Sequence, residues 1–141
     1  MSINSIEPAT LIQAISEKLR DYPEIKPPEG SMLWKTAFFK EFAPHDHESF
    51  WYIRAASLLR KVWKFGPVGV NKLRKEYGGK NRRGSKPAHS GKGAGKIIRV
   101  ALQQLEQANL IKTTEKKGRQ VSSEGQSLLE RTAHKIIREK T

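Results

Sequence analysis

Apolar residues recur every three or four positions along much of the chain, which is the spacing of an amphipathic helix. The pattern predicts four long helices, over about residues 8–21, 47–65, 95–108 and 123–139. A short helix is expected over 68–77, and another among the aromatic residues that precede Pro44. Each long helix has one apolar face, so these helices are expected to pack around a common core.

The helix expected over 47–65 is the best defined, with Asp46 as a candidate N-cap and Gly66-Pro67 at its end. Its apolar face and that of the 95–108 helix supply the expected core, of which the main residues are Trp51, Leu58, Val62, Leu102 and Leu105. Arg54, Lys61 and Lys64 recur on its polar face, and Arg60 lies between the two faces. Because Arg54 is on the polar face, it is expected to serve binding rather than stability.

Residues 110–114 and 119–121 flank a polar turn and predict a β-hairpin, and Ser123 has capping-box spacing with Gln126. Helix, short helix, loop, helix and hairpin follow one another in the order of a winged helix-turn-helix. The expected fold is therefore mainly α: a winged helix-turn-helix-like bundle around a central amphipathic helix, with one small β-hairpin and an extra N-terminal helical segment.

The chain is expected to form a single domain over 1–141. Residues 8–45 would be an N-terminal helical extension, 46–122 the winged-helix core and 123–139 the C-terminal helix. Within the core, residues 78–95 are rich in Gly and cations and contain no large apolar side chain. This stretch is expected to be a mobile loop.

Charge is concentrated in one part of the sequence. Residues 54–99 contain fourteen Lys or Arg and one acid, Glu76, which gives a net charge of +13, equal to that of the whole protein. Such a density of like charge is unfavourable in a compact domain, and a polyanion relieves it. Nucleic acid is the commonest polyanion, so the pattern indicates a nucleic-acid-binding protein.

Other classes of function are poorly supported. The chain has no Cys, no run of eighteen apolar residues, and neither the basic start nor the apolar stretch of a signal peptide, so we expect a soluble intracellular protein. The Gly-rich stretch before Ile97 lacks the spacing of a nucleotide-binding loop. His45, Asp46 and His47 make a poor metal site. We expect no catalytic residues, metal, cofactor, small-molecule substrate or membrane partner.

Several motifs together resemble a family of small-subunit ribosomal proteins, number nineteen in the archaeal and eukaryotic "e" series. They are KEFAP at 40–44, FWYIRAAS at 50–57, GPVGV at 66–70, YGGKNRRG at 77–84, LQQLE at 102–106 and GR at 118–119. The resemblance covers residues 8–138. It implies a winged-helix bundle around the central helix, a place on the rRNA in the head of the small subunit, neighbouring small-subunit proteins as partners, a cytoplasmic location on the ribosome and a role in subunit maturation. The basic positions of the family fall on Arg54, Arg60 and Arg99.

The leading hypothesis is therefore a structural rRNA-binding protein. The RNA-binding residues expected are Arg54, Arg60, Lys61, Lys64, Lys72, Lys80, Arg82, Arg83, Lys86, Lys92, Lys96 and Arg99. The alternative is a winged-helix DNA-binding regulator, which would read bases through the 95–108 helix. A basic module for an acidic protein partner would explain the charge but not the Gly-rich stretch.

Overall fold

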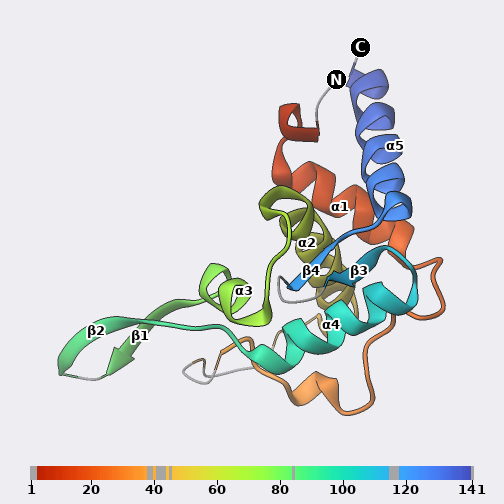
Figure 1. The fold of residues 1–141 in the computed structure, drawn as a ribbon. Helices are drawn as coiled ribbons and strands as arrows, with labels where there is room; N and C mark the ends of the chain where they lie inside the picture. The colour runs from red at the N-terminus through yellow and green to blue at the C-terminus, as the bar shows by residue number, and fades with distance from the viewer. Residues whose placement is uncertain are drawn as a thin grey trace.

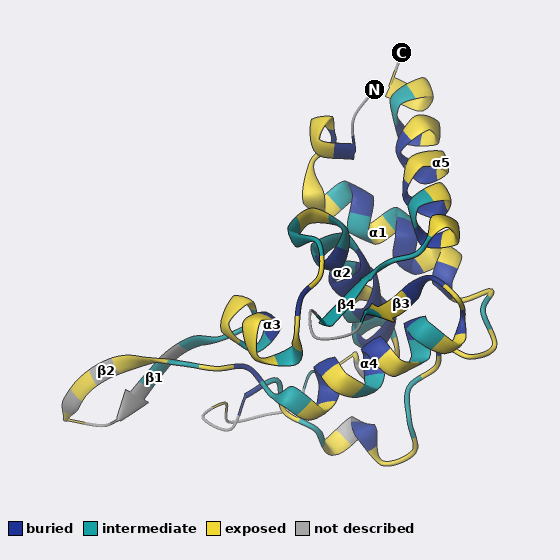
Figure 2. Ribbon diagram, in the orientation of Figure 1, coloured by how far each residue is buried: buried dark blue, intermediate teal, exposed yellow. Residues whose placement is uncertain are grey.

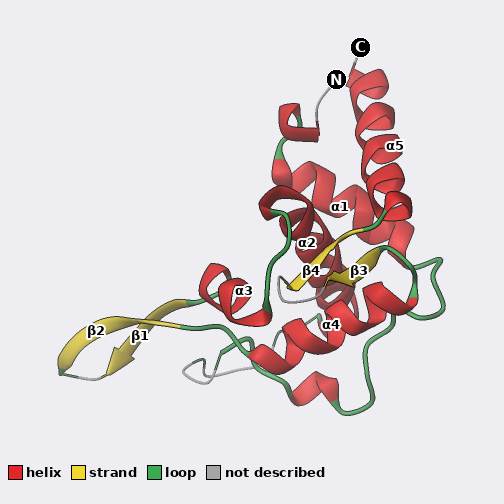
Figure 3. Cartoon of the chain, viewed as in Figure 1, coloured by secondary structure: helices red, strands yellow, loops and turns green. Residues whose placement is uncertain are grey.

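The computed structural model describes residues 3–37, 40, 44, 46–83, 85–114 and 118–140. This part of the chain is mainly helical, with two short β-hairpins (Figure 3). The α-helices are α1 (Pro8–Leu19), α2 (His47–Phe65), α3 (Val70–Glu76), α4 (Gly95–Gln107) and α5 (Ser123–Lys140). The 3₁₀ turns are η1 (Ile3–Ser5) and η2 (Ser31–Leu33). The strands are β1 (Gly79–Arg83), β2 (Lys86–Gly91), β3 (Ile111–Thr114) and β4 (Gly118–Val121).

Helix α2 lies at the centre of the helical body and contacts α1, α4 and α5 (Figure 1). The apolar faces of these helices form one continuous core. The structure buries all five residues expected there, with Trp51 1% exposed and Leu58, Val62, Leu102 and Leu105 fully buried. The buried faces of α1, α2, α4 and α5 turn inward in Figure 2, as their apolar spacing requires.

The ends of α2 follow from local chemistry. The Asp46 side chain accepts a hydrogen bond from the backbone N–H of Ser49, at 3.4 Å, so Asp46 is the N-cap as predicted. At the other end Gly66 has φ +73°, a conformation that interrupts the helix and that Gly adopts without a steric penalty. Pro67 follows, so the helix does not continue.

The β3–β4 hairpin is the wing of the winged helix. Ile111 pairs with Val121 and Thr114 with Gly118 in an antiparallel register. Val68 adds to this hairpin because it exchanges two backbone hydrogen bonds with Arg119, both of 2.9 Å. This pairing holds Val68 in an extended conformation, so α3 begins at Val70 and not at residue 68 as expected. The mainly helical, winged-helix-like fold is confirmed.

Two smaller expectations need correction. The first turn of α5 is capped by Ser122 and not by Ser123, because the Ser122 hydroxyl accepts a hydrogen bond from the N–H of Gly125, at 3.2 Å. The aromatic stretch before Pro44 was expected to be helical. Residues 34–37 are not helical and follow η2, while Phe38, Phe39 and residues 41–43 lie outside the described part of the chain.

The larger correction concerns the Gly-rich segment, which was expected to be a loop. Residues 79–83 and 86–91 form an antiparallel hairpin, in which Gly79 pairs with Gly91 and Asn81 with His89. Pairing uses backbone N–H and C=O groups and needs no buried side chain, so a polar, Gly-rich sequence does not prevent it. We call the β1–β2 hairpin the arm. It projects away from the helical body, at the end opposite the two termini (Figure 1).

We expect the amide hydrogens of the arm to exchange rapidly in the free protein. A two-stranded hairpin without a packed face is marginally stable in water, and hydrogen exchange reports such local opening. Exchange measured residue by residue should be fast over 79–91 and slow in β3–β4, which packs against the helices. Rapid exchange should be suppressed when RNA is added. Equal protection of the two hairpins in the free protein would contradict this expectation.

Candidate nucleic-acid interface

The cations of the 54–99 segment lie on elements that adjoin one another. They come from α2, from α3, from the arm, from the residues between the arm and α4, and from the first turns of α4. Helix α3 packs against α4, and the arm connects the two helices (Figure 1). The one acid of the segment, Glu76, pairs with Lys61 at 3.3 Å from Nζ to Oε2. The remaining cations of the segment therefore act together as a strongly positive region.

Tyr77 directly follows α3 and contacts the polar face of α2. The hydroxyl groups of Tyr77 and Ser57 share a hydrogen bond of 2.5 Å. The guanidinium carbon of Arg54 lies 4.2 Å from the centre of the Tyr77 ring, and Lys61 Nζ lies 5.1 Å from it. Burial raises the pKa of the Tyr77 phenol above its ordinary value, and the hydrogen bond with Ser57 opposes that shift. The neutral ring of Tyr77 thus contacts two cations, Arg54 and Lys61.

Arg54 lies between two aromatic rings, because its guanidinium carbon is also 5.1 Å from the centre of the Phe50 ring. Burial lowers the pKa of this guanidinium below its ordinary value, and the interaction with Tyr77 acts in the opposite direction. An arginine starts so far above neutral pH that it remains charged. Arg54 is on the polar side of α2 as predicted, but it is half-buried and stacked, so it contributes to stability as well.

Replacing Arg54 by Ala is expected to lower the free energy of unfolding by about 1–2 kcal/mol, through loss of the stacking and of the packed side-chain stem. Urea denaturation followed by circular dichroism measures this. Lys64→Ala is the matched control, because Lys64 is an exposed cation on the same helix and its loss should change stability by less than about 0.5 kcal/mol. A double-mutant cycle with Tyr77→Leu should show coupling. Equal stability of the Arg54 and Lys64 variants would contradict the stacking role.

A second aromatic ring organises the end of α2. The Nζ atoms of Lys72, Lys64 and Lys61 lie 5.0, 5.6 and 6.0 Å from the centre of the Phe65 ring. Lys64 and Lys72 are exposed, and Arg60 is half-buried on the same stretch of α2. Contacts with an aromatic ring restrict the lysine side chains while the exposed ammonium groups of Lys64 and Lys72 stay accessible to an anion.

Two arginines converge at the start of α4. Arg74 Nε donates a hydrogen bond to the carbonyl of Gly93 at 2.9 Å, and the N–H of Gly93 donates to the carbonyl of Arg74 at 2.8 Å. A Cβ atom placed on Gly95 would lie 3.5 Å from Arg74 Nε and 3.7 Å from Arg99 Nη2. Both guanidinium groups thus approach the first residue of α4. The positive end of the helix dipole is there too, so this place attracts phosphate.

The structure thus places the expected RNA-binding residues in two groups. Arg54, Arg60, Lys61, Lys64 and Lys72 lie on α2 and α3 around Tyr77 and Phe65, whereas Lys96 and Arg99 lie at the start of α4. Lys92 is exposed between the arm and α4. The backbones of Lys80, Arg82, Arg83 and Lys86 belong to the arm, and their side chains are outside the described part of the structure.

Two residues of this surface were not among those expected. Arg74 belongs to the cationic run, but the sequence does not indicate that it connects α3 to the residues before α4. Tyr77 follows a short helix, and no periodic pattern singles it out. Both act through contacts between elements that are distant in sequence, as in the 19-residue separation of Arg74 and Gly93.

Helix α4 uses two of its polar side chains to hold the fold together. Gln104 accepts a hydrogen bond from Trp51 Nε1 at 2.8 Å and donates one to the carbonyl of Lys26, also at 2.8 Å. Glu106 accepts a hydrogen bond from Thr113 Oγ1 at 2.6 Å, and its other oxygen lies 3.7 Å from Arg119 Nε. These two side chains connect α4 to the core and to the wing, so they are not available to read bases.

His45, Asp46 and His47, at the start of α2, were expected to make a poor metal site. Within the part of the chain that the structure describes, no group of three metal-ligating side chains comes together, and no helix is long and apolar enough to cross a membrane. His45 is outside the described residues, and Asp46 caps α2.

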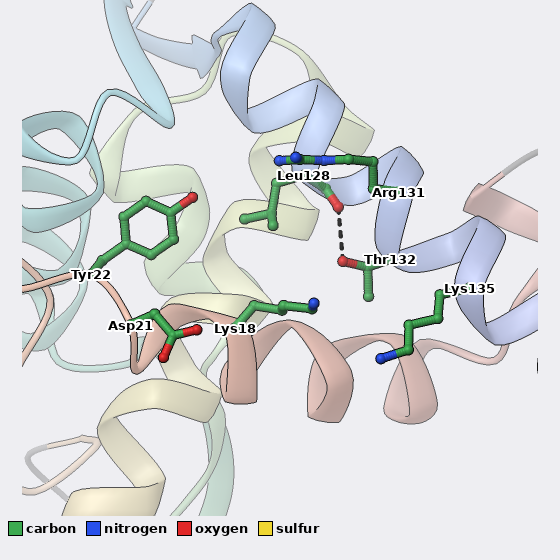
Figure 4. A pocket seen from close by; sticks show the side chains of 7 residues that line it. All are labelled: Lys18, Asp21, Tyr22, Leu128, Arg131, Thr132 and Lys135. Atoms are coloured by element: carbon green, nitrogen blue, oxygen red, sulfur yellow. Dashed lines mark hydrogen bonds between the residues drawn. The ribbon is translucent and has the colours of Figure 1, made fainter.

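A cavity of about 310 Å³ between α1 and α5 is lined mainly by Lys, Arg and apolar groups, with Asp21 as the one acid among its described lining residues (Figure 4). Thr132 in its wall donates a hydrogen bond to the Leu128 carbonyl, at 2.8 Å.

The fold and this surface define the class: a winged-helix protein whose cations are concentrated at the side that carries the arm. Comparison with known proteins then gives the family. Residues 2–139 match the model of the family described as ribosomal protein S19e. The chain belongs to the ribosomal protein S19e family, and as a ribosomal protein it is a structural, non-enzymatic component.

Individual relatives agree with this. The chain is 45% identical to the small ribosomal subunit protein eS19 of Haloarcula marismortui, in an alignment that covers 98% of this chain and 92% of the relative. It is 43% identical to the protein of the same name from Aeropyrum pernix, covering 97% and 92%. Identity to the small ribosomal subunit protein eS19A of Drosophila melanogaster is 37%, covering 97% and 87%.

Proposed function

We propose that this chain is a structural constituent of the small ribosomal subunit that binds small-subunit rRNA through its basic surface and arm. The concentration of cations carries the proposal: fourteen Lys or Arg of one segment fold into adjoining elements, and the single acid among them is paired with Lys61. Phosphate groups of RNA would neutralise these charges and release counterions, which favours binding.

The arrangement favours recognition of RNA shape over base sequence. The exposed groups on this surface are mainly Lys and Arg, which contact phosphate and 2′-OH groups without discriminating bases. Gln104 and Glu106 of α4 are engaged within the fold, so Gln103 and Gln107 are the exposed uncharged polar side chains that this helix leaves for base reading by a DNA-binding regulator. The regulator is therefore the less favoured function.

The proposal includes a cytoplasmic location on the ribosome, contacts with neighbouring small-subunit proteins and a contribution to maturation of the subunit. The names of the relatives, which are small ribosomal subunit proteins, support the ribosomal location and neighbours, and the role in maturation is what the resemblance to the family implies. If the chain takes part in maturation, cells that lack it should accumulate incompletely processed small-subunit rRNA.

Sedimentation of a native cell extract in a sucrose gradient tests the proposal. The protein is expected to migrate with the small subunit at low salt and with complete ribosomes when these are preserved. Washing with concentrated salt should weaken the association. A protein that stays at the top of the gradient in all conditions would contradict the ribosomal role and support the regulator.

A further inference from the structure

A cavity of about 300 Å³ lies where residues 34–37 meet the start of α4. Trp34 and Ile97 supply apolar lining, and Lys35, Arg74, Lys92 and Lys96 supply four cations. Among the described residues that line the cavity there is no acid. The volume is at the lower end of the range for small-ligand sites, which is about 300–1,000 Å³. A ligand that combines a flat apolar part with negative charge would suit this lining.

Trp34 is held in a fixed position. Its ring meets that of Trp51 edge-on, with 6.2 Å between ring centres and 63° between planes, and Trp51 is buried in the core. Trp34 is half-buried, so part of its indole remains accessible from the cavity. The ring is thus a rigid platform, which is the property that base-stacking side chains require.

Lys96 lies over the Trp34 ring, with Nζ 4.4 Å from the ring centre. Lys96 is exposed, and the cation–π contact of an exposed lysine is weak, so an incoming group can displace it. The face of an indole attracts either a cation or a stacked base. When a base takes this face, the ammonium group of Lys96 is free to pair with the phosphate of the same nucleotide.

Arg74 and Lys92 also line the cavity and are placed to contact the phosphate of the same nucleotide. Arg74 uses one of its five N–H donors on the Gly93 carbonyl, which fixes the guanidinium at the cavity wall. Lys92 is exposed at the rim. A phosphate bound here would therefore meet one oriented guanidinium and several ammonium groups, and the lining residues that the structure describes include no carboxylate to oppose it.

We propose that this cavity binds one unpaired nucleotide of RNA, with its base stacked on Trp34 and its phosphate held by Lys92, Lys96 and Arg74. The inference rests on the proposed rRNA-binding function and adds that part of the contact is to single-stranded RNA. An acidic peptide would satisfy the cations but would leave the indole face without a flat partner. A base within a duplex is already stacked on both sides and is not available to Trp34.

Binding of two RNAs by the full chain tests the inference: a hairpin with an unpaired loop, and a fully paired duplex of equal length. Trp34→Leu keeps an apolar contact with Trp51 but removes the stacking face. It should weaken binding of the loop RNA by about 5-fold or more, which corresponds to one stacked base. The affinity of this variant for the duplex should stay within about twofold of that of the unsubstituted protein. The salt dependence of its binding to each of the two RNAs should also stay within about twofold. Trp63→Leu, at a half-buried Trp of α2, is the matched control and should not discriminate between the RNAs.

A second measurement does not depend on the stability of a variant. Loop RNA that contains 5-iodouridine should photo-crosslink to Trp34 of the unsubstituted protein, as located by mass spectrometry. If the protein binds both RNAs but shows no such crosslink, and Trp34→Leu weakens neither, the nucleotide site is wrong while the rRNA-binding function stands. If an Asp/Glu-rich peptide suppresses the crosslink as well as unlabelled loop RNA does, the cavity accepts a protein partner and the inference is overturned. If neither RNA binds, the proposed function itself fails.

Discussion

Replacing Trp51 by Ala is expected to lower the free energy of unfolding by about 3–5 kcal/mol. The side chain is 1% exposed at the centre of the core, where its indole N–H donates a hydrogen bond to Gln104 and its ring contacts that of Trp34. Removing it leaves a large cavity and takes away one of the hydrogen bonds of Gln104 on α4. Since small domains have a total stability of about 5–15 kcal/mol, this change removes a large part of it.

Urea denaturation followed by circular dichroism measures the loss. Trp51→Phe should lower stability less than Trp51→Ala does, because it keeps an aromatic ring in the core. The remaining loss comes from the missing hydrogen bond to Gln104. Ile53→Ala is the control on the same helix, since Ile53 is 38% exposed and its truncation should have a small effect. If Trp51→Ala and Ile53→Ala unfold at the same urea concentration, the assignment of α2 as the central core helix is wrong.

Gly118→Ala is expected to lower stability by about 2–5 kcal/mol, because two unfavourable effects combine there. Gly118 has φ +96°, a conformation that residues with a side chain rarely adopt. An added Cβ atom would also collide with the carbonyl oxygen of Val68, which pairs with Arg119 beside the wing. The substitution should therefore disrupt the contact between Val68 and the β3–β4 hairpin.

Gly30→Ala separates the two effects. Gly30 has a similar φ of +80°, but an added Cβ atom there would meet nothing within 4 Å. Its replacement should therefore cost about 1 kcal/mol, from backbone strain alone. Thermal unfolding of the two variants measures the difference. If Gly118→Ala and Gly30→Ala lower the stability equally, the close approach of the wing to Val68 does not contribute to the effect of Gly118→Ala.

The sequence predicts the helical part of the fold well, because local signals and apolar spacing agree. Asp46 and Gly66 act on the backbone of α2 itself, so its bounds at 47–65 can be read directly from the residues. The apolar stripe with Leu102 and Leu105 likewise fixes the buried face of α4. The start of α3 is less predictable, since Val68 is held by Arg119, fifty-one residues further along the chain.

The arm and the cation-binding rings could not be predicted in the same way. The arm is held by backbone hydrogen bonds, which leave no pattern in a Gly-rich polar sequence. The role of Tyr77 depends on its contacts with Ser57 and Arg54 across twenty or more residues. Trp34 packs against the core and is half-buried, and its contact with Lys96 at a cavity appears only in three dimensions.

The central claim is that the basic surface binds rRNA through phosphate contacts and without reading base sequence. Filter binding to a small-subunit rRNA fragment and to an unrelated DNA duplex, across a salt series, tests it most directly. Five or more phosphate contacts should give a log–log salt slope steeper than about −4. Arg60→Ala and Arg99→Ala should each make it shallower by nearly one unit and leave sequence preference unchanged. Lys135→Ala, on α5, should leave it unaltered. A shallow slope, or a strong preference for one DNA sequence that Arg99→Ala abolishes, would contradict the account in favour of a DNA-binding regulator.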